Sequence, residues 1–168
     1  WRWGLFPMVG EGAVLTNFSI SDSSMTNGAF AGAAAGFVMT LGDVADKPVF
    51  SYIDVRNTVE ISGITVGGIV GGGTLANFDN CCVTADINKN KRTDSSQYAN
   101  GLCGNLWGQG DDIFYSVTNC YTAKYAPYNV ANKLANPINN VYAASGGTIE
   151  VKPDEVNADA MNRMPNLN

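Results

Sequence analysis

Short runs of apolar and β-branched residues, each interrupted by glycine or asparagine within a few positions, make up most of this chain. Runs of this length and composition are typical of β-strands bounded by turns. One pattern of small and apolar residues before a closing glycine occurs three times, at residues 31–36, 66–71 and 99–104. The closing glycines lie 35 and 33 residues apart. This spacing predicts an internal structural repeat.

A second pattern recurs between these motifs. Residues 55–61 (VRNTVEI) align with residues 81–87 (CCVTADI), and residues 119–123 (NCYTA) begin a further copy in step with Asn80 and Cys81. The alignment places Thr58 beside Thr84. Each unit is therefore built of at least two short strands.

The repeat predicts an all-β fold, a right-handed parallel β-helix (solenoid) of few coils. A similar period occurs in helical arrays, but these need long segments of helix-forming residues, which the frequent glycines and asparagines exclude here. A strand-built unit of this length buries its apolar face by stacking on the next unit. Equivalent residues then form interior columns, and we expect two of them: Val55, Cys81 and Cys120, and Ala35, Val70 and Cys103.

We expect a single domain over residues 1–168, made of a divergent N-terminal coil, a repeat array and a closing segment at 1–30, 31–125 and 126–168. Within the closing segment, Pro153 and the acidic residues after it favour the start of a helix. Apolar residues then follow at helical spacing. This predicts a short capping helix at about 153–164. The chain starts at Trp1 and not at a methionine, so we expect a fragment of a longer protein.

Composition excludes several function classes. The net charge is −5 and the ten Lys and Arg residues form no stripe, which argues against nucleic-acid binding. No apolar run is long enough to insert into a membrane. The sequence has no histidine and no C-x-x-C pair, which argues against a zinc site, and the lack of histidine excludes serine or cysteine catalysis as usually built. We therefore predict no metal and no cofactor.

The four cysteines are Cys81, Cys82, Cys103 and Cys120. Free buried thiols behave as small apolar side chains, and this is the state that we expect. The alternative is a disulfide bond between cysteines on neighbouring coils, because the spacing of stacked strands is compatible with one.

The units resemble the GLUG-type repeat of bacterial surface proteins. The motif GGIVG at residues 67–71 is followed by NCCVTADI at 80–87, and NGLCG at 100–104 is followed by NCYTA at 119–123. Residues 4–18 look like the coil that often precedes such repeats. The resemblance implies a β-helix on the bacterial cell surface or outside the cell. The family includes adhesins and the non-catalytic regions of large proteases.

Trp107, Asp111 and Asp112 are the candidate ligand-binding residues. Trp107 lies in a glycine-rich loop and could be an exposed platform for a sugar or an apolar partner. The alternative is that its ring packs over a sheet. Asp111 and Asp112 could hold Ca²⁺, although such pairs are usually solvated turn residues.

The function that we expect is a non-catalytic cell-surface or secreted module for adhesion, ligand recognition or spacing, and not an enzyme. Its partners would be a host glycan or protein, or other domains of the parent chain. The alternative is a carbohydrate-active β-helix, a polysaccharide lyase or glycoside hydrolase, for which Asp54 and Asp86 are the best acidic candidates. These two fall at different repeat positions. An aligned row of Thr58, Thr84 and Thr122 would also suit ice binding, but stacked threonines equally stabilise ordinary sheets.

Overall fold

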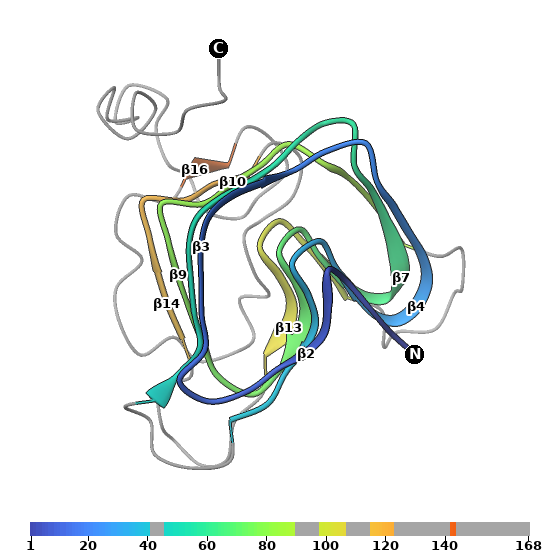
Figure 1. Ribbon diagram of the computed structural model, residues 1–168. Helices are drawn as coiled ribbons and strands as arrows, with labels where there is room; N and C mark the ends of the chain where they lie inside the picture. The colour runs from blue at the N-terminus through green and yellow to red at the C-terminus, as the bar shows by residue number, and fades with distance from the viewer. Residues whose placement is uncertain (41–45, 90–97, 107–114, 123–141, 144–168) are drawn as a thin grey trace.

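The computed structural model describes residues 1–40, 46–89, 98–106, 115–122 and 142–143 (Figure 1). In these residues the chain consists of β-strands in three parallel sheets, and the described part contains no α-helix. The expected all-β class is confirmed. The helix predicted at about 153–164 lies outside the described residues.

The chain visits the three sheets in a fixed order, and one visit to all three is called a pass here. Sheet A contains β1 (Arg2–Trp3), β4 (Ser24–Gly32), β7 (Glu60–Gly67), β11 (Asp86–Lys89) and β12 (Tyr98–Asn100). Sheet B contains β2 (Phe6–Val9), β5 (Ala35–Val38), β8 (Val70–Gly73) and β13 (Cys103–Leu106). Sheet C contains β3 (Val14–Ile20), β6 (Val49–Val55), β9 (Ala76–Asp79), β10 (Cys82–Val83), β14 (Tyr115–Thr118), β15 (Tyr121–Thr122) and β16 (Tyr142–Ala143).

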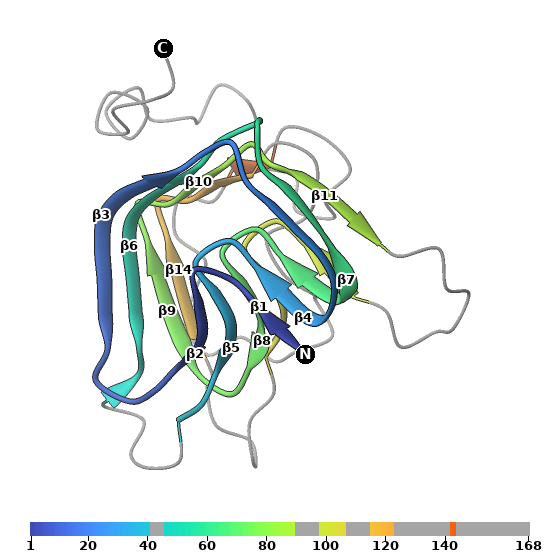
Figure 2. The ribbon, with the colours of Figure 1, turned by 45° about the vertical axis from the view of Figure 1, so that its right-hand side comes forward.

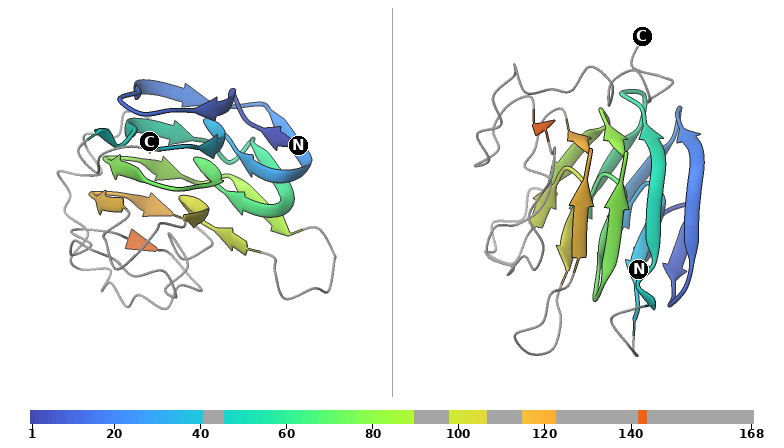
Figure 3. Two further views of the ribbon diagram at one scale, coloured as in Figure 1. Left: turned by 90° about the horizontal axis from the view of Figure 1, so that it is seen from below. Right: turned by 90° about the vertical axis from the view of Figure 1, so that its left-hand side faces the viewer.

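The glycine-closed motifs lie side by side in successive passes. In sheet A, Val66 is the register partner of both Ala31 and Ala99. In sheet B, Val70 is the partner of both Ala35 and Cys103, which confirms this predicted column. The strands of successive passes are adjacent along the length of the molecule (Figures 2 and 3). The repeat read from the sequence is thus a repeat in space.

Sheets A and C form an arc, and the strands of sheet B lie within it (Figure 1). The space between them holds one apolar core, because alternate residues of each strand point inward. The rings of Phe50 and Phe78, on neighbouring strands of sheet C, stack with centroids 5.5 Å apart and are almost completely buried. The largest other buried side chains are Ile53, Ile61, Ile69, Ile87 and Leu102.

The predicted column of Val55, Cys81 and Cys120 is wrong at Val55. Val55 pairs with Val83, and Cys82 pairs with both Asp54 and Tyr121. Cys81 and Cys120 are therefore neighbours, as expected, but they lie in register with Ile53. The cause is the corner between sheets C and A, where four residues separate Val55 from β7 and only two separate Val83 from β11. The alignment is correct again beyond this corner.

A second corner, within sheet C, is formed by residues with left-handed backbone conformation. Asn17, Asn80 and Asn119 have φ angles of 61°, 50° and 49°, and Tyr52 has a φ of 52°. The flanking register places these four residues next to one another in successive passes. Asparagine adopts this conformation more readily than other residues with a side chain. Tyr52 is therefore the strained member of the row.

We expect Tyr52→Asn to raise the free energy of unfolding by about 1 kcal/mol, because asparagine relieves the strain of the left-handed backbone. The tyrosine side chain is 42% exposed, so little packing is lost. Urea unfolding at constant m-value measures the change. Tyr52→Phe keeps the strain and is the control. Equal stability of the two variants would contradict the assignment.

Candidate functional site

The predicted binding residues Trp107, Asp111 and Asp112 lie outside the described residues. The structure does place the acidic candidates Asp54 and Asp86, the four cysteines, and Trp1 and Trp3 at the N-terminus.

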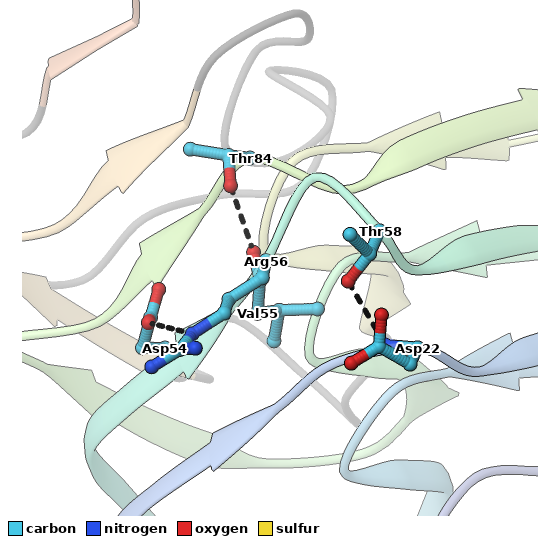
Figure 4. A network of polar contacts seen from close by, with 6 residues as sticks. All are labelled: Asp22, Asp54, Val55, Arg56, Thr58 and Thr84. Atoms are coloured by element: carbon cyan, nitrogen blue, oxygen red, sulfur yellow. Dashed lines mark hydrogen bonds and ion pairs between the residues drawn. The ribbon is translucent and has the colours of Figure 1, made fainter. Parts of the chain in front are cut away.

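Asp54 lies at the end of β6, where sheet C meets the corner to sheet A (Figure 4). Its carboxylate accepts a hydrogen bond from Arg56 Nε at 3.2 Å and forms an ion pair with this side chain. The Asp54 side chain is only 9% exposed, whereas that of Arg56 is 42% exposed. A carboxylate that is buried and already paired is a poor general acid or base for an external substrate.

Other polar groups of this corner join successive passes to each other. The backbone N–H of Asp22 donates to Thr58 Oγ1 at 2.9 Å, and Thr84 Oγ1 donates to the carbonyl oxygen of Val55 at 3.2 Å (Figure 4). Thr58 and Thr84 each bond to the preceding pass, whereas Thr122 is buried and is the register partner of Val83 and not of Thr84. The predicted row of three threonines is therefore wrong at Thr122, and the basis for ice binding is lost with it.

Asp54 and Asp86 lie in different sheets, C and A, as their different repeat positions suggested. Asp86 is instead the register partner of Glu60, which in turn pairs with Ser24. Sequence reasoning aligned Glu60 with Asp86 but did not recognise them as a carboxylate pair. Among the described residues, no group of three or more Asp, Glu, His and Cys side chains could hold a metal ion.

All four cysteines are free thiols and all are buried, which is the state expected from the sequence. Burial raises the pKa of Cys82 to about 12, and the nearby Asp54 carboxylate and Cys81 add to this effect. Burial likewise raises the thiol pKa of Cys103 and of Cys120. A protonated thiol is a weak nucleophile, so these cysteines are suited to packing and not to catalysis in the folded chain.

Exposed apolar side chains gather on the first pass. Six of the seven large apolar side chains that are exposed in the described residues belong to residues 1–14. Trp1 is 89% exposed and Trp3 is 47% exposed, and the others are Leu5, Phe6, Met8 and Val14. We call this group the N-terminal apolar surface. Apolar clusters of this kind commonly mark binding surfaces.

The strand edge beneath this surface carries a proline. Phe6 is the register partner of Ala35, which places Pro7 at the position of Gly36. A Cβ atom on Gly36 would lie 2.7 Å from the backbone nitrogen of Trp3 in the preceding pass. The glycines at this position in later passes, Gly71 and Gly104, are crowded by the preceding pass in the same way.

Pro7 occupies the same register position in the first pass. Its ring would obstruct a strand placed before β2, and it has no backbone N–H to donate to one. Proline on an edge strand opposes the addition of a further strand. The N-terminal apolar surface is therefore better suited to contacts through side chains than to backbone pairing.

Comparison of the chain with family models, curated proteins and solved structures finds no match. The resemblance to the GLUG-type repeat stays a prediction carried by its motifs. No helix in the described part of the chain is long and apolar enough to cross a membrane.

Proposed function

We propose that the chain forms a right-handed parallel β-helix of the GLUG-repeat type. Three parallel sheets visited in constant order support this proposal, as does the register of the glycine-closed motifs. The row of left-handed residues in sheet C adds a corner that is repeated in successive passes. Each of these features follows from stacking one coil on the next.

We propose further that this β-helix is a non-catalytic module of a bacterial cell-surface or secreted protein, acting in adhesion, ligand recognition or spacing. The observation that carries the proposal is the N-terminal apolar surface, where Trp3 and its neighbours are exposed in this chain and Pro7 has no N–H to offer a further strand. The polar groups at the corner near Asp54, in contrast, form hydrogen bonds between successive passes. A host glycan or an extracellular protein would bind through stacking and apolar contacts with the tryptophans.

A glycan array and a panel of extracellular-matrix proteins, both probed with the labelled chain, test the recognition role. We expect binding to at least one probe and a loss of affinity of about tenfold in the double variant Trp3→Ser/Met8→Ser, since each side chain contributes about 1 kcal/mol or more. The control is Tyr52→Asn, which removes an aromatic side chain of similar exposure elsewhere. No binding in either assay would contradict recognition and leave only spacing.

A carbohydrate-active β-helix is the second candidate, and one observation favours it. Glu60 and Asp86 are register partners on neighbouring strands of sheet A, so their side chains leave the sheet on the same face. Glycosidases use two carboxyl groups that face one substrate, and in retaining enzymes these groups are about 5–5.5 Å apart. Incubation with a panel of polysaccharides, followed by a reducing-end assay, separates the two functions. Cleavage that is lost in Glu60→Gln would support the enzyme and contradict the non-catalytic proposal.

A further inference from the structure

Cys81 and Cys120 lie side by side, immediately before the adjacent strands β10 and β15 of sheet C. Cys82 and Tyr121 are register partners in parallel strands, so the residues just before them also lie side by side. Neighbouring strands are about 4.8 Å apart, which is within the range of about 4.4–6.8 Å between the Cα atoms of disulfide-bonded cysteines. We propose that Cys81 and Cys120 form an intramolecular disulfide bond when the chain folds in the presence of a small-molecule disulfide.

The two cysteines have the same local surroundings. Each follows an asparagine in left-handed conformation, Asn80 with a φ of 50° and Asn119 with a φ of 49°. The backbone N–H of Tyr121 donates to the carbonyl oxygen of Cys81 at 2.8 Å, which fixes the two segments against each other. Both side chains therefore leave the backbone in the same direction.

The two thiols also lie near each other. Both residues are fully buried, and the nearby Cys81 adds to the effect of burial in raising the pKa of the Cys120 thiol. Each thiol also donates to the carbonyl oxygen two residues earlier, at 3.3 Å for Cys81 and 3.2 Å for Cys120. These matched contacts hold the two sulfur atoms on the same side of their strands.

The other two cysteines are not placed to compete. Cys82 is the first residue of β10, and its register partners on either side are Asp54 and Tyr121, not a cysteine. Cys103 lies in sheet B, where its register partner is Val70. The geometry therefore selects a single pair of thiols.

The reaction is thiol–disulfide exchange in two steps. The thiolate of one cysteine attacks the small disulfide RSSR, which forms a mixed disulfide and releases RSH. The second cysteine then attacks the protein sulfur of the mixed disulfide and releases another RSH. Two electrons and two protons pass from the protein to RSSR. Because the folded thiols are buried, exchange takes place while the chain folds or opens.

The bond would join the residues just before β10 and β15 and close a long loop of the chain. Closing such a loop restricts the unfolded chain and stabilises the folded one. This inference goes beyond the proposed surface function and does not rest on it, so either can fail alone.

Refolding from urea in a buffer of reduced and oxidised glutathione tests the proposal. After alkylation of the remaining thiols, we expect the refolded chain to carry two alkyl groups and not four. Peptide mapping by mass spectrometry should show the segment with Cys120 linked to the segment with Cys81. The urea midpoint should be higher than that of the reduced chain, and dithiothreitol should abolish the difference. Alkylation of all four thiols in the refolded wild-type chain would overturn the proposal.

Single alanine variants identify the partners. Cys82→Ala and Cys103→Ala should keep the linked peptide, whereas Cys81→Ala and Cys120→Ala should lose it. Circular dichroism of each variant checks that it has folded. The peptide mapping of the wild-type chain tests the proposal even if a variant does not fold. A linked peptide that persists in Cys81→Ala, or one that contains Cys103, would also overturn the proposal.

Discussion

A Gly71→Ala variant is expected to lose about 3 kcal/mol or more of its free energy of unfolding, as in other overpacked cores. Gly71 lies on β8 in sheet B, close to the backbone of β4 in sheet A. A Cβ atom there would lie 2.5 Å from the backbone nitrogen of Ala31 and 2.5 Å from the carbonyl oxygen of Gly36. Both atoms belong to the backbone of the preceding pass, so no side chain can move aside to make room.

Gly10→Ala is the matched control for Gly71→Ala. The nearest atom to a Cβ on Gly10 is the carbonyl oxygen of Met39, 4.0 Å away, which is an ordinary contact. We expect this variant to change stability by less than about 0.5 kcal/mol. Urea unfolding followed by circular dichroism measures both variants. Equal stability of Gly71→Ala and Gly10→Ala would show that the passes are not packed as described.

Alkaline pH is expected to unfold the reduced protein steeply. The ordinary thiol pKa is 9.0, and burial raises that of Cys82 to about 12. Below pH 9 the folded and unfolded states both keep this proton. Between pH 9 and 12 the unfolded chain releases it while the folded chain keeps it, so stability is lost as the pH rises. Each such thiol contributes about 1.4 kcal/mol per pH unit.

The pKa values of Cys103 and Cys120 are raised as well. The three thiols together therefore give a slope of about 4 kcal/mol per pH unit, enough to unfold a typical domain within a few pH units. Urea unfolding at a series of pH values from 7 to 11, with reductant present, measures the slope.

Cys103→Val separates the thiols from the tyrosines and lysines that ionise in the same range. Valine already occupies this column at Val70, so the change is nearly volume-conserving. We expect the slope of the variant to be smaller by about 1.4 kcal/mol per pH unit. Parallel pH profiles for the wild type and Cys103→Val would refute the role of the buried thiol.

The stacking of the glycine-closed motifs could be predicted because close backbone packing requires glycine at fixed positions, and these glycines are visible in the sequence. Where backbones of neighbouring passes approach closely, as at the closing glycines Gly36, Gly71 and Gly104, a Cβ atom would clash with the preceding pass, and the repeated glycine can be counted in the sequence. The corner between sheets C and A has no such recurring residue. Its length differs by two residues between passes, and the similarity of the two aligned segments concealed the shift of register at Val55.

The row of left-handed residues could have been found in the sequence. Asn17, Asn80 and Asn119 each stand at the same position of a pass, but Tyr52 takes this place in one pass and hides the pattern. The candidate site was harder to predict. Trp1 and Trp3 are exposed, but the sequence does not show this, because their exposure depends on how the passes cover one another. Glu60 and Asp86 were aligned, but only pairing of β7 with β11 makes them neighbours.

The central claim is that successive passes lie in register, and proton distances test it most directly. In a sample with labelled alanine and valine methyl groups, nuclear Overhauser effects should connect Ala31 with Val66 and Ala35 with Val70, which are register partners. These residues are 35 positions apart in sequence. The presence of both signals is the predicted result. Their absence, or signals that join Ala31 to Val70 in their place, would contradict the stacked arrangement.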